Sequence, residues 1–584
     1  MLSEIKNDYK LEMLHNTIQA WIEYTPWTQY PEHWSTVTQL AEEAHKNGLK
    51  VGSTFGFHTS EFFEAHIDDP YGFLYYYKTL PENEKWKFPN GTIADDPYYV
   101  GSSRSFSGKL VWRKDMYSVM QPQNPYWVKF LIEWGKKNID CGADGIFLDS
   151  IDGSFPMFWH GGWGNNQTWE GYMFIKFLKE RHSKDELETW GVNLNNFSLN
   201  HYLKNKYNLI GVYGTEYLVR GFYKSSWLEQ AIFENPEEIM QDPVVKEYIL
   251  YQYITLQNFV KNITRALKTY AESLNKTILL TANEYETWNP ETYDIHGITG
   301  ILLIPYFDVV YIERNSFNIP PYQKDIAVYK AAIAATQYSK PVWVSEWTLY
   351  FSNPFNPDMP PLNISTLLKI KIAEGYATGG IRLIPFGTGP PGYWPPQRLV
   401  NGPERDEIAK YYNFINEHKE IFLNVRSNAS VALIYSIPTV IWQYFPTLGL
   451  YPKIYKAELG GWAAALEELH IPYDIIIFGL SPFFNDTCNS NQLKKYSVII
   501  APQLSRISQK QLETLENYVS SGGKLIITPP LAQFDEMNNP QTSSIIENVL
   551  NNSNTVIIEE SLGYQYQESL EKRKPQRTNP KRNI

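Results

Sequence analysis

Four acidic residues follow short apolar segments that have the composition of buried β-strands. They are Asp149, Glu284, Glu313 and Glu346. Burying a carboxylate is costly, so an acid in such a place is either a helix cap, an ion-pair partner or a group kept for chemistry. Two carboxyl groups on opposite sides of a glycosidic bond can hydrolyse it, because one donates a proton while the other attacks or activates water. The spacing of these acids therefore suggests a two-carboxylate hydrolase.

Each acid also has an ordinary structural interpretation. Asp149 could cap the next helix, although the apolar strand before it favours a chemical role, and the nearby Asp152-Gly153 is typical of a turn. Glu313 is followed by Arg314, which offers a simple ion pair. These interpretations stay open at the level of sequence.

The remaining two acids have neighbours that suit a sugar. Glu346 lies between Trp343 and Trp347, and a carboxylate between indole rings is costly to bury without a role. Glu284 follows Asn283, whose amide could bind a sugar hydroxyl.

Aromatic and polar residues close to these positions are candidates for substrate binding, since aromatic rings stack on the apolar faces of sugars. The segment Trp159–Trp163 (WHGGW) has two glycines and a histidine, which is unusual for a core and suggests a loop over the site. The predicted substrate-binding residues are Trp27, His58, Trp159, Trp163, Asn283, Glu284, Tyr311 and Trp347.

The elements that must position these residues alternate between strands and helices as far as about residue 422. Near-continuous apolar strands followed by amphipathic helices are typical of parallel sheets covered by helices. The eight strand candidates are residues 17–24, 50–57, 117–120, 145–148, 277–282, 308–312, 341–345 and 380–386. Eight such units predict a (β/α)8 TIM barrel over residues 1–422, with the active site at the carboxyl ends of its strands.

The barrel sequence also contains features that predict individual helices. Asn124-Pro125 is a typical helix start, with an N-cap and proline at the first position. Residues 151–276 are too long for a simple connection and contain helical patterns near 169–181 and 243–273, so we expect an inserted helical subdomain there.

The pattern restarts after residue 422 and predicts a smaller, doubly wound α/β domain over residues 428–560. Strands are expected at 430–435, 473–478, 496–500 and 524–528, and Ser508 with Gln511 forms a capping box for a helix. The polar, basic end of the chain, residues 571–584, is predicted to be disordered.

Composition excludes several classes of function. The chain has 584 residues and a formal net charge of −11, which argues against nucleic acid as a partner. Two cysteines, Cys141 and Cys488, cannot form a disulfide framework or a cysteine metal site, and no metal or organic cofactor is expected. No run of 18 apolar residues predicts a membrane span.

The sequence is compatible with more than one cellular compartment. The first residues lack the apolar core of a signal peptide, but Asn-x-Ser/Thr sequons would permit an extracellular location. The sequons begin at Asn90, Asn166, Asn196, Asn262, Asn275, Asn363, Asn428, Asn485 and Asn551.

The C-terminal segment resembles a known domain. Segments such as Val431–Ser436, Leu469–Asp474, Val498–Pro502 and Leu515–Leu525 are similar to the trimerisation domain that follows the barrel in family 42 β-galactosidases. The resemblance implies an amidotransferase-like fold without its chemistry and a homo-oligomer formed through this domain. Cys488 lies in a polar loop rather than at a strand-to-helix elbow, which agrees with the loss of that chemistry.

The barrel resembles the same family more loosely. Phe307–Val310 and Lys340–Glu346 are similar to its sixth and seventh strands, and the seventh carries the nucleophile, which corresponds to Glu346. The fourth strand departs from the Asn-Glu of the family and has Leu148-Asp149-Ser150. That strand resembles α-galactosidase-type barrels, where this Asp is the nucleophile and its partner follows the sixth strand, at Glu313.

Two mechanisms follow from the two resemblances. In the first, Glu346 is the nucleophile and Asp149 the acid/base; in the second, Asp149 is the nucleophile and Glu313 the acid/base. We therefore expect a retaining glycoside hydrolase acting on an oligo- or polysaccharide. The alternative is a catalytically inactive carbohydrate-binding or cell-surface structural protein on the same fold.

Overall fold

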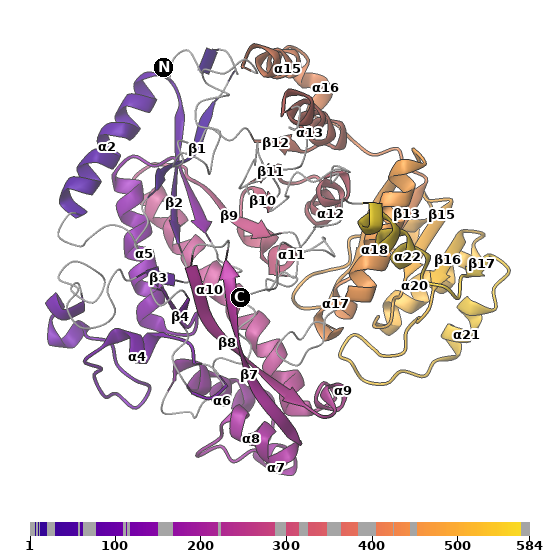
Figure 1. Ribbon diagram of the computed structural model, residues 1–584, viewed down its shortest axis with the longest axis horizontal. Helices are drawn as coiled ribbons and strands as arrows, with labels where there is room; N and C mark the ends of the chain where they lie inside the picture. Colours follow the sequence, from indigo (N-terminus) through magenta and orange to yellow (C-terminus); the bar gives the residue numbers. More distant parts are fainter. Residues whose placement is uncertain are drawn as a thin grey trace, which may run out of the picture.

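The computed structural model describes the chain from Lys6 to Arg573 with some segments excepted. The excepted residues are 8–9, 11, 20–29, 57–58, 62–76, 105, 109–111, 114–116, 150–167, 220–222, 286–298, 315–324, 347–363, 384–404, 424 and 444–452. Two parallel sheets dominate the described part, one in each half of the molecule (Figure 1).

The larger sheet has seven strands in the described part, and their spatial order is their order along the chain. All neighbouring pairs are parallel. The strands are β1 (Met13–Gln19), β2 (Lys50–Gly56), β6 (Gly145–Asp149), β9 (Leu279–Tyr285), β10 (Val310–Arg314), β11 (Val342–Glu346) and β12 (Ile381–Arg382). Sequential parallel strands with covering helices form the architecture of a (β/α)8 barrel, as predicted.

Helices cover the sheet where the sequence places them. Asn124 caps α5 by accepting hydrogen bonds from the backbone N–H groups of Tyr126 and Trp127, and Pro125 is the first helical residue, which confirms that helix start. The helices of this half that follow a sheet strand or pack beside one are α2 (Tyr30–Lys46), α5 (Pro125–Asp140), α10 (Pro243–Ser273), α11 (Thr299–Leu303), α12 (Ile326–Thr336), α13 (Ile364–Thr378), α15 (Arg405–Glu417) and α16 (Lys419–Phe422). Short turns of helix add η2 (Glu82–Glu84), α4 (Pro97–Gly101) and η4 (Ile304–Tyr306).

The strand expected at 117–120 does not join the large sheet. Residues Tyr117–Val119 form β5, which pairs antiparallel with β3 (Thr59–Glu61) and β4 (Trp112–Arg113), while β2 pairs directly with β6. A strand inside a parallel sheet is buried on both faces and needs a nearly continuous apolar sequence. Tyr-Ser-Val is too short and too polar for that position, so the prediction of an eighth sheet strand there was wrong.

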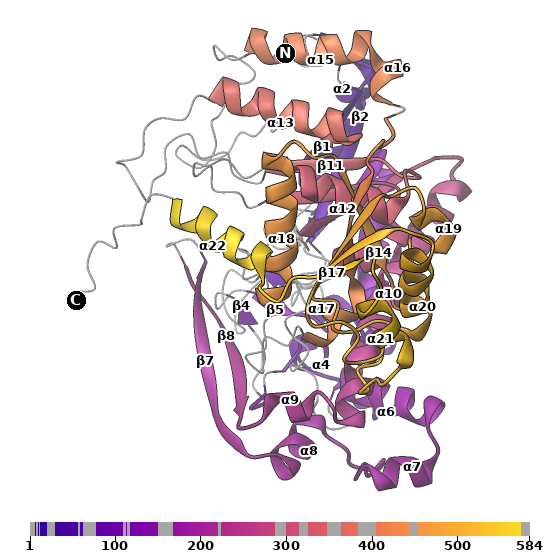
Figure 2. The ribbon, with the colours of Figure 1, turned by 90° about the vertical axis from the view of Figure 1, so that its right-hand side faces the viewer.

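The segment between β6 and β9 contains both predicted helices, α6 (Trp169–Arg181) and α10, at the expected residues. It also contains α7 (Lys184–Thr189), α8 (Leu199–Lys206), α9 (Pro236–Ile239) and a ribbon that the sequence did not reveal. The ribbon consists of the antiparallel strands β7 (Leu209–Val219) and β8 (Tyr223–Phe233), and Figure 2 shows it standing along one side of the molecule.

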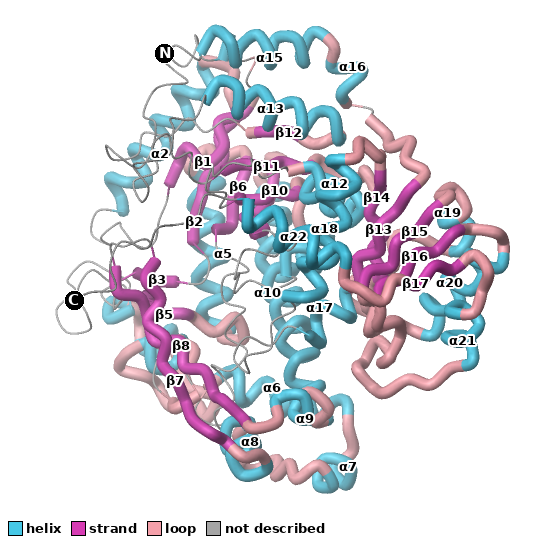
Figure 3. Tube along the Cα trace, turned by 45° about the vertical axis from the view of Figure 1, so that its right-hand side comes forward, coloured by secondary structure: helices cyan, strands magenta, loops and turns pink. Residues whose placement is uncertain are grey.

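The smaller sheet, seen in Figure 3 beside the larger one, has the strand order β14-β13-β15-β16-β17 and is parallel throughout. Its strands are β13 (Val431–Ser436), β14 (Tyr473–Phe478), β15 (Val498–Pro502), β16 (Lys524–Thr528) and β17 (Thr555–Ile557). Its helices are α17 (Ile437–Gln443), α18 (Lys453–Glu468), α19 (Ser490–Leu493), α20 (Gln509–Ser520), α21 (Ser544–Leu550) and α22 (Leu562–Arg573). This order is that of a doubly wound α/β fold.

Sequence signals in this half are confirmed closely. Ser508 and Gln511 form the expected reciprocal capping box at the start of α20. Residues 571–573 belong to α22, whereas the rest of the tail predicted to be disordered, 574–584, lies outside the described residues.

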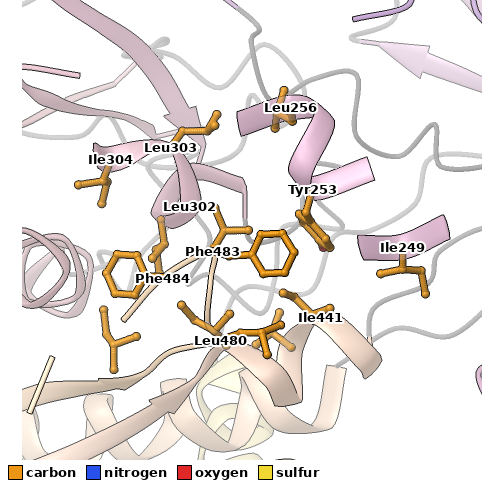
Figure 4. Packing of buried hydrophobic residues seen from close by; sticks show 14 of the residues in the cluster. Ile249, Tyr253, Leu256, Leu302, Leu303, Ile304, Ile441, Leu480, Phe483 and Phe484 are labelled. Carbon is orange, nitrogen blue, oxygen red and sulfur yellow. The ribbon is translucent and has the colours of Figure 1, made fainter. Parts of the chain in front are cut away.

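An apolar interface joins the two halves (Figure 4). Phe483 of the smaller half packs against the ring of Tyr253 on α10, with ring centroids 6.2 Å apart. The side chain of Gln257 donates hydrogen bonds to the backbone carbonyls of Phe483 and Leu302 at 3.1 and 2.9 Å. One continuous hydrophobic cluster therefore includes buried residues from both sheets.

Two glycines let α18 and α22 touch through their backbones. A Cβ atom at Gly461 would lie 1.7 Å from the carbonyl oxygen of Gly563, which excludes any larger residue at Gly461 without movement of α22. Buried Glu458 fixes the crossing, because its carboxylate accepts hydrogen bonds from the N–H of Tyr564 at 2.7 Å and from the indole of Trp462 at 2.9 Å.

We expect Gly461→Ala to displace α22. The overpacking should cost about 1–3 kcal/mol of stability, and α22 should become accessible to protease. Limited chymotrypsin digestion followed by mass spectrometry measures this as faster cleavage after Tyr564 and Tyr566. Ala465→Ser on the same helix is the control, and equal cleavage of both variants would contradict the close contact.

Candidate active site

The structure places the four candidate acids on four neighbouring strands, β6, β9, β10 and β11, near their carboxyl ends. Asp149 and Glu346 are the last residues of β6 and β11, and Glu313 is the second last of β10. For these acids and for Asn283 the backbone is described, and the register is known.

The register divides the acids into two alternating sets. Tyr311 pairs with Asn283 and Trp343, and Glu313 pairs with Ser345. Because residues two apart on a strand belong to the same face, Glu313 falls in the set of Tyr311, and Asp149 in the set of Phe147. These two sets meet, since the rings of Phe147 and Tyr311 contact each other with centroids 4.9 Å apart.

Glu284 and Glu346 fall in the opposite set. Glu284 pairs with Ile312, which in turn pairs with Val344, and Glu346 pairs with Arg314. Strand β2 shows which side of the sheet this set belongs to. There Ser53 pairs with Ile146, and its hydroxyl donates a hydrogen bond to the side chain of Asn138 on the covering helix α5.

Of the predicted substrate-binding residues, the side chain of Tyr311 alone is described. It is 6% exposed and packs on Phe147, so its ring belongs to the interior layer beneath the strand ends. Trp27, His58, Trp159, Trp163 and Trp347 lie outside the described residues.

A further buried acid was not recognised in the sequence. Glu170 is buried in the first turn of α6, directly after the segment that begins at Asp149. Its carboxylate accepts hydrogen bonds from the hydroxyl of Tyr248 and the amide of Gln252, both on α10. Its backbone N–H donates to the side chain of Gln121 at 3.1 Å, and its carbonyl accepts from Tyr251 at 3.1 Å. Glu170 therefore links α6, α10 and the segment after β5.

No salt bridge within the described residues includes Glu170. Burial raises the pKa of its carboxyl to about 7, although the hydrogen bonds from Tyr248 and Gln252 act in the opposite direction. The folded protein thus binds a proton that the unfolded chain releases near the ordinary value of 4.5. The stabilisation that the protonated carboxyl of Glu170 contributes is fully present below about pH 4.5 and is lost as the pH rises through about 7.

We expect Glu170→Gln to stabilise the protein at pH 8 by up to roughly 3 kcal/mol and to have little effect at pH 5. The amide keeps the shape and removes the buried charge. Melting temperatures of wild type and variant at both pH values provide the measurement. An equal difference at pH 5 and pH 8 would show that Glu170 does not titrate in this range.

The described part of the chain contains no group of three or more His, Cys, Asp or Glu residues placed to hold a metal ion. Among the same residues, no helix combines the length and apolar character needed to cross a bilayer.

Comparisons with known proteins agree with this fold. Residues 429–555 match the family model of the β-galactosidase trimerisation domain. A β-galactosidase from Bacillus circulans sp. alkalophilus superimposes with a TM-score of 0.58 at 13% identity, covering 93% of this chain and 70% of that one. The chain has the fold of family 42 β-galactosidases.

Two other solved structures agree. A β-galactosidase from Rahnella sp. R3 gives a TM-score of 0.57 at 14% identity over 94% of this chain and 71% of that one. A GH42 β-galactosidase from G. stearothermophilus gives 0.56 at 12% identity over 93% and 70%. A search of curated protein sequences found no match. The similarity therefore establishes the fold across both halves and leaves the reaction to be argued from the site.

Proposed function

We propose that the protein is a glycoside hydrolase that cleaves O-glycosidic bonds of an oligo- or polysaccharide with two carboxyl groups and retention of configuration. The observation that carries the proposal is the presence of an acid near the carboxyl end of each of four adjacent parallel strands. In barrels of this kind the active site lies at that end. The fold shared with β-galactosidases supports the same chemistry.

Asp149 is the acid common to both proposed mechanisms, and its partner is either Glu346 or Glu313. Similarity of Lys340–Glu346 to the seventh strand of family 42 enzymes supports Glu346 as nucleophile. The register supports Glu313 instead, because Asp149 and Glu313 belong to the alternating sets of Phe147 and Tyr311, whose rings are in contact.

The test of the function is a screen of the purified protein on aryl glycosides and on plant and microbial polysaccharides. We expect hydrolysis of at least one substrate by the wild type and loss of that hydrolysis in Asp149→Asn. Binding of a glycan without cleavage by either protein would instead favour an inactive carbohydrate-binding protein.

The partner acid is identified on the substrate found in that screen. Glu346→Gln and Glu313→Gln are compared in the same assay, and the variant of the true partner should lose activity to the extent of Asp149→Asn. The variant of the other acid should retain most of it.

We also propose that the chain self-associates through residues 429–555, since this segment matches a trimerisation domain. Apolar side chains on its surface support the proposal, with Leu469 68% and Ile471 37% exposed. Light scattering coupled to size exclusion should give a multiple of the 67.9 kDa chain mass. A monomer at micromolar concentration would contradict this assembly.

A further inference from the structure

Three buried ionisable side chains and one partly buried one lie together beside the last strands of the large sheet. Asp325 is at the centre, because its Oδ2 atom lies 3.0 Å from Nζ of Lys371 and 3.3 Å from Nη1 of Arg382. Glu374 completes the group, with Oε2 3.4 Å from Nζ of Lys371 and 3.2 Å from the backbone N of Asp325. The side chains of Asp325, Lys371 and Arg382 are at most 2% exposed.

The cluster joins the elements that follow the candidate acids. Asp325 begins α12, the first described element after β10 and Glu313. Lys371 belongs to α13, the first described element after β11 and Glu346. Arg382 ends β12 and pairs with Val344, two residues before Glu346. The cluster thus connects the start of α12 and the middle of α13 to β12.

Packing around Arg382 is equally close. Its carbonyl accepts a hydrogen bond from the hydroxyl of Tyr412 at 2.9 Å, and the next residue, Leu383, donates its N–H to the carbonyl of Val344 at 3.0 Å. A Cβ atom at Gly380 would lie 2.2 Å from the ring of Tyr329 on α12. The end of β12 therefore has little freedom to move relative to β11.

Stability alone does not account for buried charges of this kind. Removing charges from water is expensive, and replacing a whole buried ion cluster by apolar side chains of similar size is often neutral or stabilising. What such a cluster does provide is a defined geometry, because its opposite charges come close together in one arrangement only. Its links to Val344, two residues before Glu346, and to α12, the first described element after Glu313, suggest which geometry is being defined.

We propose that Asp325, Lys371 and Arg382 are positioning residues that hold the carboxyl ends of β10, β11 and β12 in the arrangement needed for catalysis. The inference rests on the proposed glycosidase function. It predicts that changes in the cluster lower kcat strongly but change the melting temperature and KM only slightly.

The first experiment removes all four charges of the cluster at once. The triple variant Asp325→Leu, Lys371→Met, Arg382→Met is made on a Glu374→Gln background, so that no charge of the cluster is left unpaired, and it should keep a melting temperature within about 5 °C of the wild type for the reason just given. On the substrate identified for the wild type, kcat should fall by about 100-fold or more while KM changes less than threefold. An unchanged kcat would overturn the inference.

A conservative variant covers the case in which the triple variant does not fold. Arg382→Lys keeps the positive charge but loses the planar guanidinium, so kcat should fall about tenfold with little change in melting temperature. A kcat equal to that of the wild type would again overturn the inference.

The control is an ion pair between Lys268 on α10 and Asp308, which lies at the end of β10 opposite to Glu313. Asp308, before β10, accepts from the N–H of Leu280 at 2.9 Å and lies 2.5 Å from Nζ of Lys268. Asp308→Asn should lower the melting temperature without lowering kcat, and a kcat loss as large as that of the triple variant would contradict a specific positioning role. If the wild type cleaves nothing, the proposed function and this inference both fail. If it cleaves and the cluster variants do so equally well, the positioning role alone fails.

Discussion

Replacing Asp149 by asparagine is expected to lower kcat by at least about 10³-fold on the substrate that the wild type cleaves. Asparagine keeps the size of the side chain but can neither transfer a proton nor act as a nucleophile. Asp149 is the last residue of β6, at the end of the sheet. We therefore expect that folding of the protein does not depend on the charge of this side chain. The melting temperature should stay within about 2 °C.

Glutamine at Glu284 serves as the matched control for Asp149. Glu284 is on the adjacent strand β9, but neither proposed mechanism uses it as acid, base or nucleophile. Its loss should raise KM and affect kcat far less than the loss of Asp149. Similar kcat losses in both variants would mean that Asp149 has no special part in the reaction.

The second large effect concerns stability and is expected at Asp242. Its carboxylate is fully buried, caps α10 through the N–H groups of Val244 and Val245, and accepts hydrogen bonds from Tyr202 and Tyr207. Lys206 lies 2.8 Å from the same oxygen. Asp242→Ala removes all these contacts and leaves the partners unsatisfied, so we expect a loss of about 3–5 kcal/mol.

Thermal unfolding followed by circular dichroism measures this loss as a lower melting temperature. Asp242→Asn is the informative comparison, since its amide oxygen can still cap α10 while the charge near Lys206 is gone; its loss should be clearly smaller. If the alanine variant melted within about 1 °C of the wild type, the network around Asp242 would not contribute to stability.

Local signals made much of the fold predictable. Asn124-Pro125, Ser508 with Gln511, and the apolar runs of the smaller sheet each depend on neighbours within a few residues, and each is confirmed. The strand at 117–119 was predicted in the wrong sheet. Which strand pairs with β2 depends on residues far apart in the sequence, so a local pattern does not reveal it.

The site was predictable to a lesser extent, for the same reason. The positions of the acids at strand ends follow from the nearly continuous apolar runs that precede them. The pairing of Asp325 with Arg382, 57 positions apart, and of Glu170 with Tyr248, 78 apart, depends on tertiary packing. Arg382 stands in a strand-like sequence, and Glu170 in an ordinary first helical turn, so neither has a local signal of burial.

The central claim is that Asp149 is one of two carboxyl groups that cleave a glycosidic bond. Azide rescue of Asp149→Gly tests it most directly, with the product analysed by NMR. We predict that azide restores turnover and yields a glycosyl azide, in the configuration of the substrate if Asp149 is the acid/base and in the opposite one if it is the nucleophile. A glycine variant as active as the wild type, or an inactive one that azide does not rescue and that forms no glycosyl azide, would contradict the account.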